Sequence, residues 1–147
     1  MPKNKLPKIR SKPIGWIVVD MFNFHCPVFT SDEARVAFSK KKDIPFEAYN
    51  EPSYGHVCRS IDDDGSYYFS MVLTPEASIG TWAHESSHLT DFIFERFSIP
   101  TGVKNTEVRA YMIGCMVDQI AEFMAKESLR LNQGQAAEAS PSPIPLH

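Results

Sequence analysis

The sequence predicts one α+β domain in which a small antiparallel β-sheet packs against two long helices, with a metal held between the helices. Three patterns predict this fold class: a β-hairpin over residues 55–73, an HExxH motif inside a helix at 79–97, and a second helix at about 106–129. The chain has 147 residues, of which 43% are hydrophobic and 22% are charged. These values suit a single domain with its own hydrophobic core.

The chain divides into three parts. Residues 1–12 form a basic arm that we expect to be flexible, residues 13–130 form the folded domain, and residues 131–147 form a tail that we expect to be disordered. The tail is rich in Gln, Ala, Ser and Pro, and it cannot bury enough apolar surface to order itself. The basic side chains of the arm are Lys3, Lys5, Lys8, Arg10 and Lys12.

Charge and composition exclude several classes of protein. A net charge of −3 gives no general attraction to nucleic acid or to an anionic membrane. No apolar run approaches the roughly 20 residues that span a bilayer. The three cysteines are odd in number and form no CxxC pair, so they predict no disulfide framework. We therefore expect a cytoplasmic protein without a nucleic-acid or membrane partner, and the sequence leaves its oligomeric state open.

The first elements of the domain are a strand and a short helix. Residues 13–22 are rich in β-branched and aromatic side chains, which is typical of a strand. Residues 31–42 begin with Ser31, a residue that caps helix N-termini, and end in three lysines. Acidic residues at the start and lysines at the end favour a helix, because they complement its dipole.

The hairpin has arms at 55–61 and 66–73, joined by a turn in which Gly65 can adopt a positive φ without strain. The second arm lies directly before the motif helix. Its stretch Tyr67–Leu73 is a candidate for binding an extended peptide by strand addition, and packing of the same aromatic side chains in the core is the alternative.

The segment His84-Glu85-Ser86-Ser87-His88 carries the chemistry. On a helix, residues at i and i+4 lie on one face, so His84 and His88 can bind one metal ion. Glu85 is offset by about 100° and can reach a water at the metal without being a ligand. We therefore expect one Zn²⁺ per chain, with Glu85 as the general base.

A catalytic zinc normally has three protein ligands. Glu107 is the candidate for the third, because it lies 19 residues after His88 and early in the next helix. An acid in the first turn of a helix, favoured by the dipole alone, is the other interpretation. Asp91 shares the face of the two histidines one turn further on, where we expect it to orient His88 or Arg109.

Two segments carry a resemblance to a known family. Residues 81–88 and 105–111 resemble small zinc metallopeptidases of the gluzincin type, and more closely the compact metallopeptidases found in bacteriophage and prophage genomes. The resemblance covers about residues 55–121. It implies a minimal zincin-like fold, zinc held by His84, His88 and Glu107, a peptide or protein substrate, and the host cytoplasm as the compartment of a phage-encoded chain.

If the resemblance holds, the chain is a metalloendopeptidase. Zinc polarises the scissile carbonyl and lowers the pKa of its water towards about 7, while Glu85 accepts the proton and passes it to the leaving amine. A further donor usually stabilises the oxyanion. Tyr111, one turn after Glu107, and His56, at the start of the hairpin, are the candidates.

Two other functions remain open. The first is a metal-binding interaction protein, which keeps the zinc and acts on a host factor by binding rather than by hydrolysis. The intact Glu85 argues against it, because a structural zinc site needs no base. The second is a nucleic-acid-associated factor that uses the basic arm, for which no aromatic residues between the lysines give support.

Overall fold

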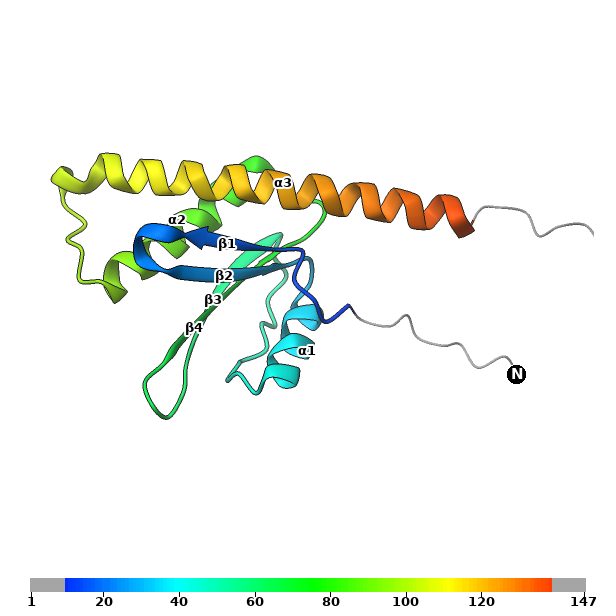
Figure 1. Cartoon of the computed structure of the whole chain (residues 1–147), viewed down its shortest axis with the longest axis horizontal. Helices are drawn as coiled ribbons and strands as arrows, with labels where there is room; N and C mark the ends of the chain where they lie inside the picture. The colour runs from blue at the N-terminus through cyan, green and yellow to red at the C-terminus, as the bar shows by residue number, and fades with distance from the viewer. Residues whose placement is uncertain (1–9, 139–147) are drawn as a thin grey trace, which may run out of the picture.

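The computed structural model describes residues 10–138. In chain order these residues form β1 (Gly15–Val19), β2 (Phe24–Phe29), α1 (Asp32–Lys42), β3 (Gly55–Ile61), β4 (Tyr67–Leu73), α2 (Ile79–Arg96) and α3 (Thr106–Glu138). Short 3-10 turns follow β1 and precede α3. Helices α2 and α3 cover one face of the sheet, and α1 lies on the other (Figure 1). The predicted α+β class is confirmed.

The four strands form one sheet in the order β1-β2-β4-β3. The pairs β1–β2 and β3–β4 are antiparallel, whereas β2 and β4 run parallel. The expectation of a purely antiparallel sheet is therefore wrong in this pair. The chain passes through α1 and β3 before it forms β4, and this crossover gives β2 and β4 the same direction. The sequence does not reveal β2, because Pro27 in its middle argues against a paired strand.

The local turn and cap signals are confirmed. The hairpin arms lie within one residue of the expected bounds, and Gly65 has φ of +84°. Ser31 caps α1 by accepting a hydrogen bond from the Ala34 N–H at 3.2 Å. These features depend only on neighbouring residues, which explains why the sequence predicts them well.

Helix α3 is longer than expected. It continues to Glu138, so residues 131–138, assigned to a disordered tail, are helical in the structure. Gln and Ala favour helix, and no proline follows until Pro141. Near the N-terminus of the described residues, Arg10 forms an ion pair with Glu127 of α3 at 2.7 Å. The rest of the expected arm and tail, 1–9 and 139–147, lies outside the described residues. No helix within the described range is long and apolar enough to cross a membrane.

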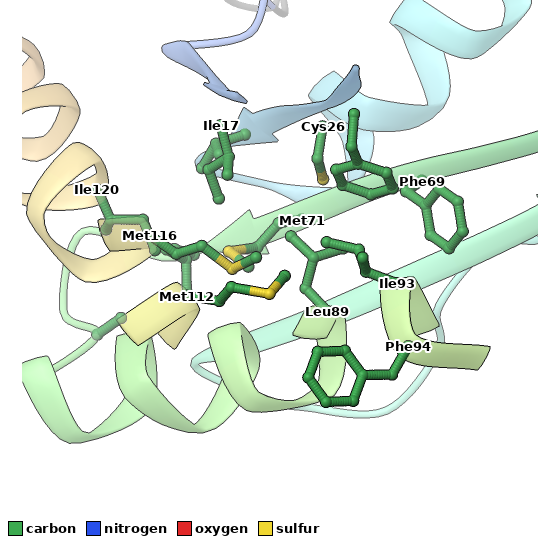
Figure 2. Close-up of a cluster of buried hydrophobic side chains, with 14 residues drawn as sticks. Ile17, Cys26, Phe69, Met71, Leu89, Ile93, Phe94, Met112, Met116 and Ile120 are labelled. Atoms are coloured by element: carbon green, nitrogen blue, oxygen red, sulfur yellow. The ribbon is translucent and has the colours of Figure 1, made fainter. Parts of the chain in front are cut away.

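The main core lies between the sheet and the two long helices (Figure 2). Each completely buried aliphatic or aromatic side chain contributes about 1.5–3 kcal/mol. The sheet supplies Ile17, Cys26, Phe69 and Met71, α2 supplies Leu89, Ile93 and Phe94, and α3 supplies Met112, Met116 and Ile120. A smaller cluster under α1 contains Phe29, Ala34, Phe38 and Val72.

The outer edge of β1 is closed by a side chain rather than by a strand. Gln119 of α3 accepts a hydrogen bond from the Val18 N–H at 2.9 Å and donates one to the Val18 carbonyl at 3.1 Å. The amide group of Gln119 therefore takes the place of a neighbouring strand. It follows that the N–H and C=O of Val18 point away from β2.

Replacing Gln119 by Leu should lower the free energy of unfolding by about 1–2 kcal/mol, because both hydrogen bonds to Val18 are lost while the volume is kept. The measurement is urea unfolding followed by circular dichroism. Gln119→Glu, which keeps only the acceptor, should lie between Gln119→Leu and the wild type. Equal stability of all three proteins would contradict a role for the amide at this edge.

Candidate metal centre

The two histidines of the HExxH motif lie on the exposed face of α2. Their Nε2 atoms are 3.0 Å apart, and the rings are nearly perpendicular, at 88°. The helix that carries them is capped by Ser78, which accepts a hydrogen bond from the Thr81 N–H. Two imidazole nitrogens that converge in this way present two ligand positions to one metal ion.

Glu85 is offset by about 100° around the helix from His84 and is buried against β3. Burial raises the pKa of its carboxyl above the usual range, and the nearby His84, His88 and the Val57 N–H offset part of this rise. A partly desolvated carboxylate is a stronger base than an exposed one. Its position next to the two histidines is therefore suited to proton transfer.

The approach of α2 to β3 depends on the missing side chain of Gly55. A Cβ atom at this position would lie 2.9 Å from Cδ2 of Leu73, 3.0 Å from Cγ2 of Thr81 and 3.1 Å from Cγ of Glu85. Any side chain would therefore push β3 away from the start of α2 or displace Glu85. Sequence reasoning did not single out Gly55, because a glycine at the start of a strand carries no signal of what packs against it.

Arg109 of α3 ties the two long helices together beside the motif. Its Nη2 donates to the Ser87 hydroxyl at 2.6 Å, and its Nε donates to Asp91 at 3.1 Å. The expected contact between Asp91 and Arg109 is confirmed. The contact with Ser87 was not predicted, because it depends on how α3 is rotated about its axis.

The structure does not bring Glu107 to the histidine pair. Glu107 lies two residues before Arg109, which is about 200° around the helix, so it points away from α2. Within residues 10–138, no three His, Cys, Asp or Glu side chains form a group that could hold a metal ion. The two histidines therefore lie together as a pair, whereas the expected third ligand does not join them.

Tyr111 lies on the same face of α3 as Glu107 and is 71% exposed. Its hydroxyl interacts with the thiol of Cys115, and this hydrogen bond raises the pKa of the phenol. The expectation that Tyr111 stabilises an oxyanion is not supported by this placement. The helical phase that directs Arg109 towards α2 directs both Glu107 and Tyr111 away from it.

His56 also lies away from the motif helix. Alternate residues of a strand face opposite sides of the sheet, and Gly55 and Val57 face α2, so His56 faces α1. There its Nε2 lies 3.3 Å from Oδ1 of Asp32, and the ring of Tyr49 stacks on the imidazole. The predicted role of His56 as an oxyanion donor is therefore wrong in this arrangement.

His56 and Asp32 belong to a buried polar cluster under α1. Arg35, completely buried, donates to Asp32 at 2.7 Å. Burial lowers the pKa of His56, and Asp32 only partly offsets this. Burial alone raises the pKa of Asp32, but the hydrogen bonds from Arg35 and from the Tyr49 N–H outweigh it and lower the pKa. Both groups are thus held in the form they have at neutral pH.

Strand β4, the candidate for peptide binding by strand addition, is not an outer edge of the sheet. It lies between β2 and β3, paired with β3 over Tyr67–Leu73 and with β2 at Met71 and Val72. The free outer edge is β3, next to Glu85. Residues of β3 with even numbers bond to β4, as the bond from Thr74 N–H to the Tyr54 carbonyl shows. The odd-numbered residues therefore direct their N–H and C=O groups outwards.

Replacing Gly55 by Ala should lower the free energy of unfolding by about 1–3 kcal/mol, because the added methyl group overlaps Leu73, Thr81 and Glu85. The measurement is urea unfolding. Gly102→Ala, at a glycine with open space around it, is the matched control. A Gly55→Ala protein as stable as this control would show that β3 and α2 have room to separate.

Acid should destabilise the fold in two stages. The pKa of His56 is lowered from its usual 6.5, so its contribution to stability is present above that pH and is lost as the pH falls below it. Asp32 acts in the same direction below its usual 3.8. The urea concentration at the midpoint of unfolding should decrease as the pH is lowered from 7 to 5, and His56→Gln should make this decrease smaller. His25→Gln, on an exposed residue, should leave it unchanged, and an equal effect of both variants would exclude the cluster.

Comparisons with known proteins identify no relative of this chain. No protein-family model matches the sequence, and no curated protein or solved structure matches it. A functional assignment therefore rests on the chain's own geometry at His84, Glu85 and His88.

Proposed function

We propose that this protein is a zinc-dependent peptidase. One observation carries the proposal: His84 and His88 direct their Nε2 atoms to within 3.0 Å of each other, while Glu85, the residue after His84, is buried beside the free strand β3. Two nitrogen ligands, a desolvated base and a strand edge that can align a peptide then lie at one place. Metal-assisted hydrolysis of a peptide bond uses each of these three parts.

His84 and His88 would hold the metal. When bound, zinc supplies Lewis-acid polarisation of a carbonyl and activation of a water molecule. Glu85 accepts the proton of the attacking water on its carboxylate and later releases it to the leaving amine. Its partial desolvation favours the first transfer, since the raised pKa makes the carboxylate more basic.

The edge of β3 would orient the substrate. The C=O group of Val57 and the N–H and C=O groups of Arg59 can pair with an extended peptide, as strands do in a sheet. The N–H of Val57 donates a hydrogen bond to Glu85, so the base lies directly at this edge. A peptide paired along the edge would have its scissile bond near the base.

The resemblance assigns the third ligand to Glu107, which points away from α2. To reach the histidine pair, the first turn of α3 has to rotate and release the contacts of Arg109 with Ser87 and Asp91. A metal centre with only two protein ligands leaves more positions to water and substrate. A centre that includes Glu107 should lose its metal in Glu107→Ala, whereas a centre with only the two histidines should keep it.

Elemental mass spectrometry of tag-free protein prepared without chelator should find one zinc per chain. His84→Ala should lose it, because a single imidazole holds the ion weakly, and Glu85→Gln should keep it while losing cleavage of a quenched fluorescent peptide library. His25→Ala is the matched control, a histidine on β2 that should change neither value. Loss of zinc in Glu107→Ala shows that α3 closes onto the pair, and retention identifies a two-histidine centre.

Two results would contradict the proposal. If the wild type takes up no zinc even when zinc is offered, the motif is a coincidence. If zinc binds but no peptide is cleaved by the wild type, the exposed two-histidine pair favours the second candidate, a metal-binding interaction protein. Residues 10–138 place no third ligand beside the two histidines. In an interaction protein of this kind, a partner would supply the remaining ligands.

A further inference from the structure

The sheet separates between β2 and β4. The two strands pair only at Val28 with Met71 and at Phe29 with Val72. Before these pairs the strands diverge, and the β1–β2 and β3–β4 hairpins point in different directions (Figure 1). A cavity of about 650 Å³ fills the space between the diverging halves.

Pro27 explains why the ladder stops there. In a parallel pair, a residue whose N–H and C=O face the partner bonds to two residues on that partner. Phe29 directs its N–H and C=O groups towards β4, and the backbone of Pro27, two positions before it, faces the same way. A further bond of the ladder would need an N–H on Pro27, and proline has none. The ladder therefore ends at a position fixed by the sequence.

The backbone groups of β2 in the gap have no strand beside them. Because Gln119 binds the N–H and C=O of Val18 from the outer side, Val18 and its partner His25 are not bonded to each other. The N–H and C=O of His25 consequently face β4. His25 comes before Val28, the first residue of β2 that pairs with β4. Its N–H and C=O groups therefore face the cavity that His25 lines.

The same holds for the first half of β4. Its even-numbered residues bond to β3, so the odd-numbered Tyr67 and Phe69 direct their N–H and C=O groups towards β2. Both residues line the cavity and lie before the first pair with β2. Two strand edges thus face each other across the gap, each with hydrogen-bonding groups for one more strand.

The side chains around the gap are suited to an acidic occupant. None of the residues that line the cavity is an aspartate or a glutamate, in a chain with 18 of them. Their ionisable nitrogens belong to His25, Arg35 and Arg96, and of the two arginines Arg35 is already paired with Asp32. Arg96 lies over the ring of Tyr67 at 5.0 Å and has no carboxylate partner within residues 10–138.

We propose that the gap binds an extended acidic peptide segment, which enters between β2 and β4 as an additional strand. The backbone of the segment pairs with His25 on one side and with Phe69 on the other. Alternate side chains carry the carboxylates and face the α2 side of the sheet, where Arg96 lies over Tyr67 and the rings of Phe24 and Phe69 are 4.9 Å apart. The remaining side chains are apolar and face the α1 side, where Trp16, Pro27 and Ile44 line the cavity.

This site is separate from the candidate metal centre. None of His84, Glu85 and His88 lines the cavity. The peptide site is therefore independent of the proposed hydrolysis, and it can be tested in a chain that cannot cleave. A protein that binds no zinc can still bind a peptide in the gap, so failure of one proposal leaves the other intact.

The test is amide hydrogen exchange by NMR on the full chain carrying Glu85→Gln. The probe is an acetylated and amidated octapeptide of alternating valine and glutamate. At ten times its Kd, exchange at the N–H groups of His25, Tyr67 and Phe69 should slow about tenfold. The helical N–H groups of Leu89 and Ile93 in α2, residues that do not line the cavity, serve as the internal control and should not change.

Matched variants test the charge. Arg96→Gln should weaken binding of the probe about threefold to fivefold, since an exposed charge pair contributes little more. Lys126→Gln is the control, because Lys126 is an exposed cation of α3 that does not line the cavity. A peptide of alternating valine and lysine should bind more weakly than the probe.

Four outcomes would overturn the proposal. They are no protection at the gap, protection only along β3, equal binding of the lysine peptide, and glutarate shifting the same NMR signals with the affinity of the probe. The second outcome would assign peptide binding to the free edge of the sheet. The last would identify the gap as a pocket for small carboxylates.

Discussion

The close contact between α2 and β3 is the constraint on which the rest of the structure depends. It exists because residue 55 has no side chain, so that Leu73, Thr81 and Glu85 meet in the space a Cβ would occupy. From this point α2 runs across the sheet and buries Leu89 and Ile93 completely. With α2 held in this position, its opposite face, which carries the two histidines, is exposed to solvent, and the base stays inside.

Much of the fold could be predicted from the sequence where neighbouring residues decide the outcome. The Asp-Gly turn of the hairpin, the Ser31 cap and the i, i+4 spacing of the histidines depend on a few adjacent positions. The long-range features could not be predicted in this way. The parallel pairing of β2 with β4 joins residues about 43 positions apart, and a pattern of hydrophobicity gives no information about such a partner.

Three site residues were misplaced for a related reason. The motif fixes the spacing of the histidines, but only the packed core fixes how α3 is rotated, through Met112 and Met116. That rotation directs Arg109 inwards and Glu107 and Tyr111 outwards. Similarly, His56 lies one residue from positions that face α2, and one residue is enough to move a side chain to the opposite face of a sheet.

The amide of Gln119 has a consequence for self-association. A sheet with two free edges can add copies head to tail without limit, which leads to open filaments. Here the outer edge of β1 is blocked at Val18. Pairing of two identical β3 edges is two-fold symmetric and closed. Association through β3 alone therefore stops at a dimer, and one side chain on a helix keeps the opposite outer edge from extending it.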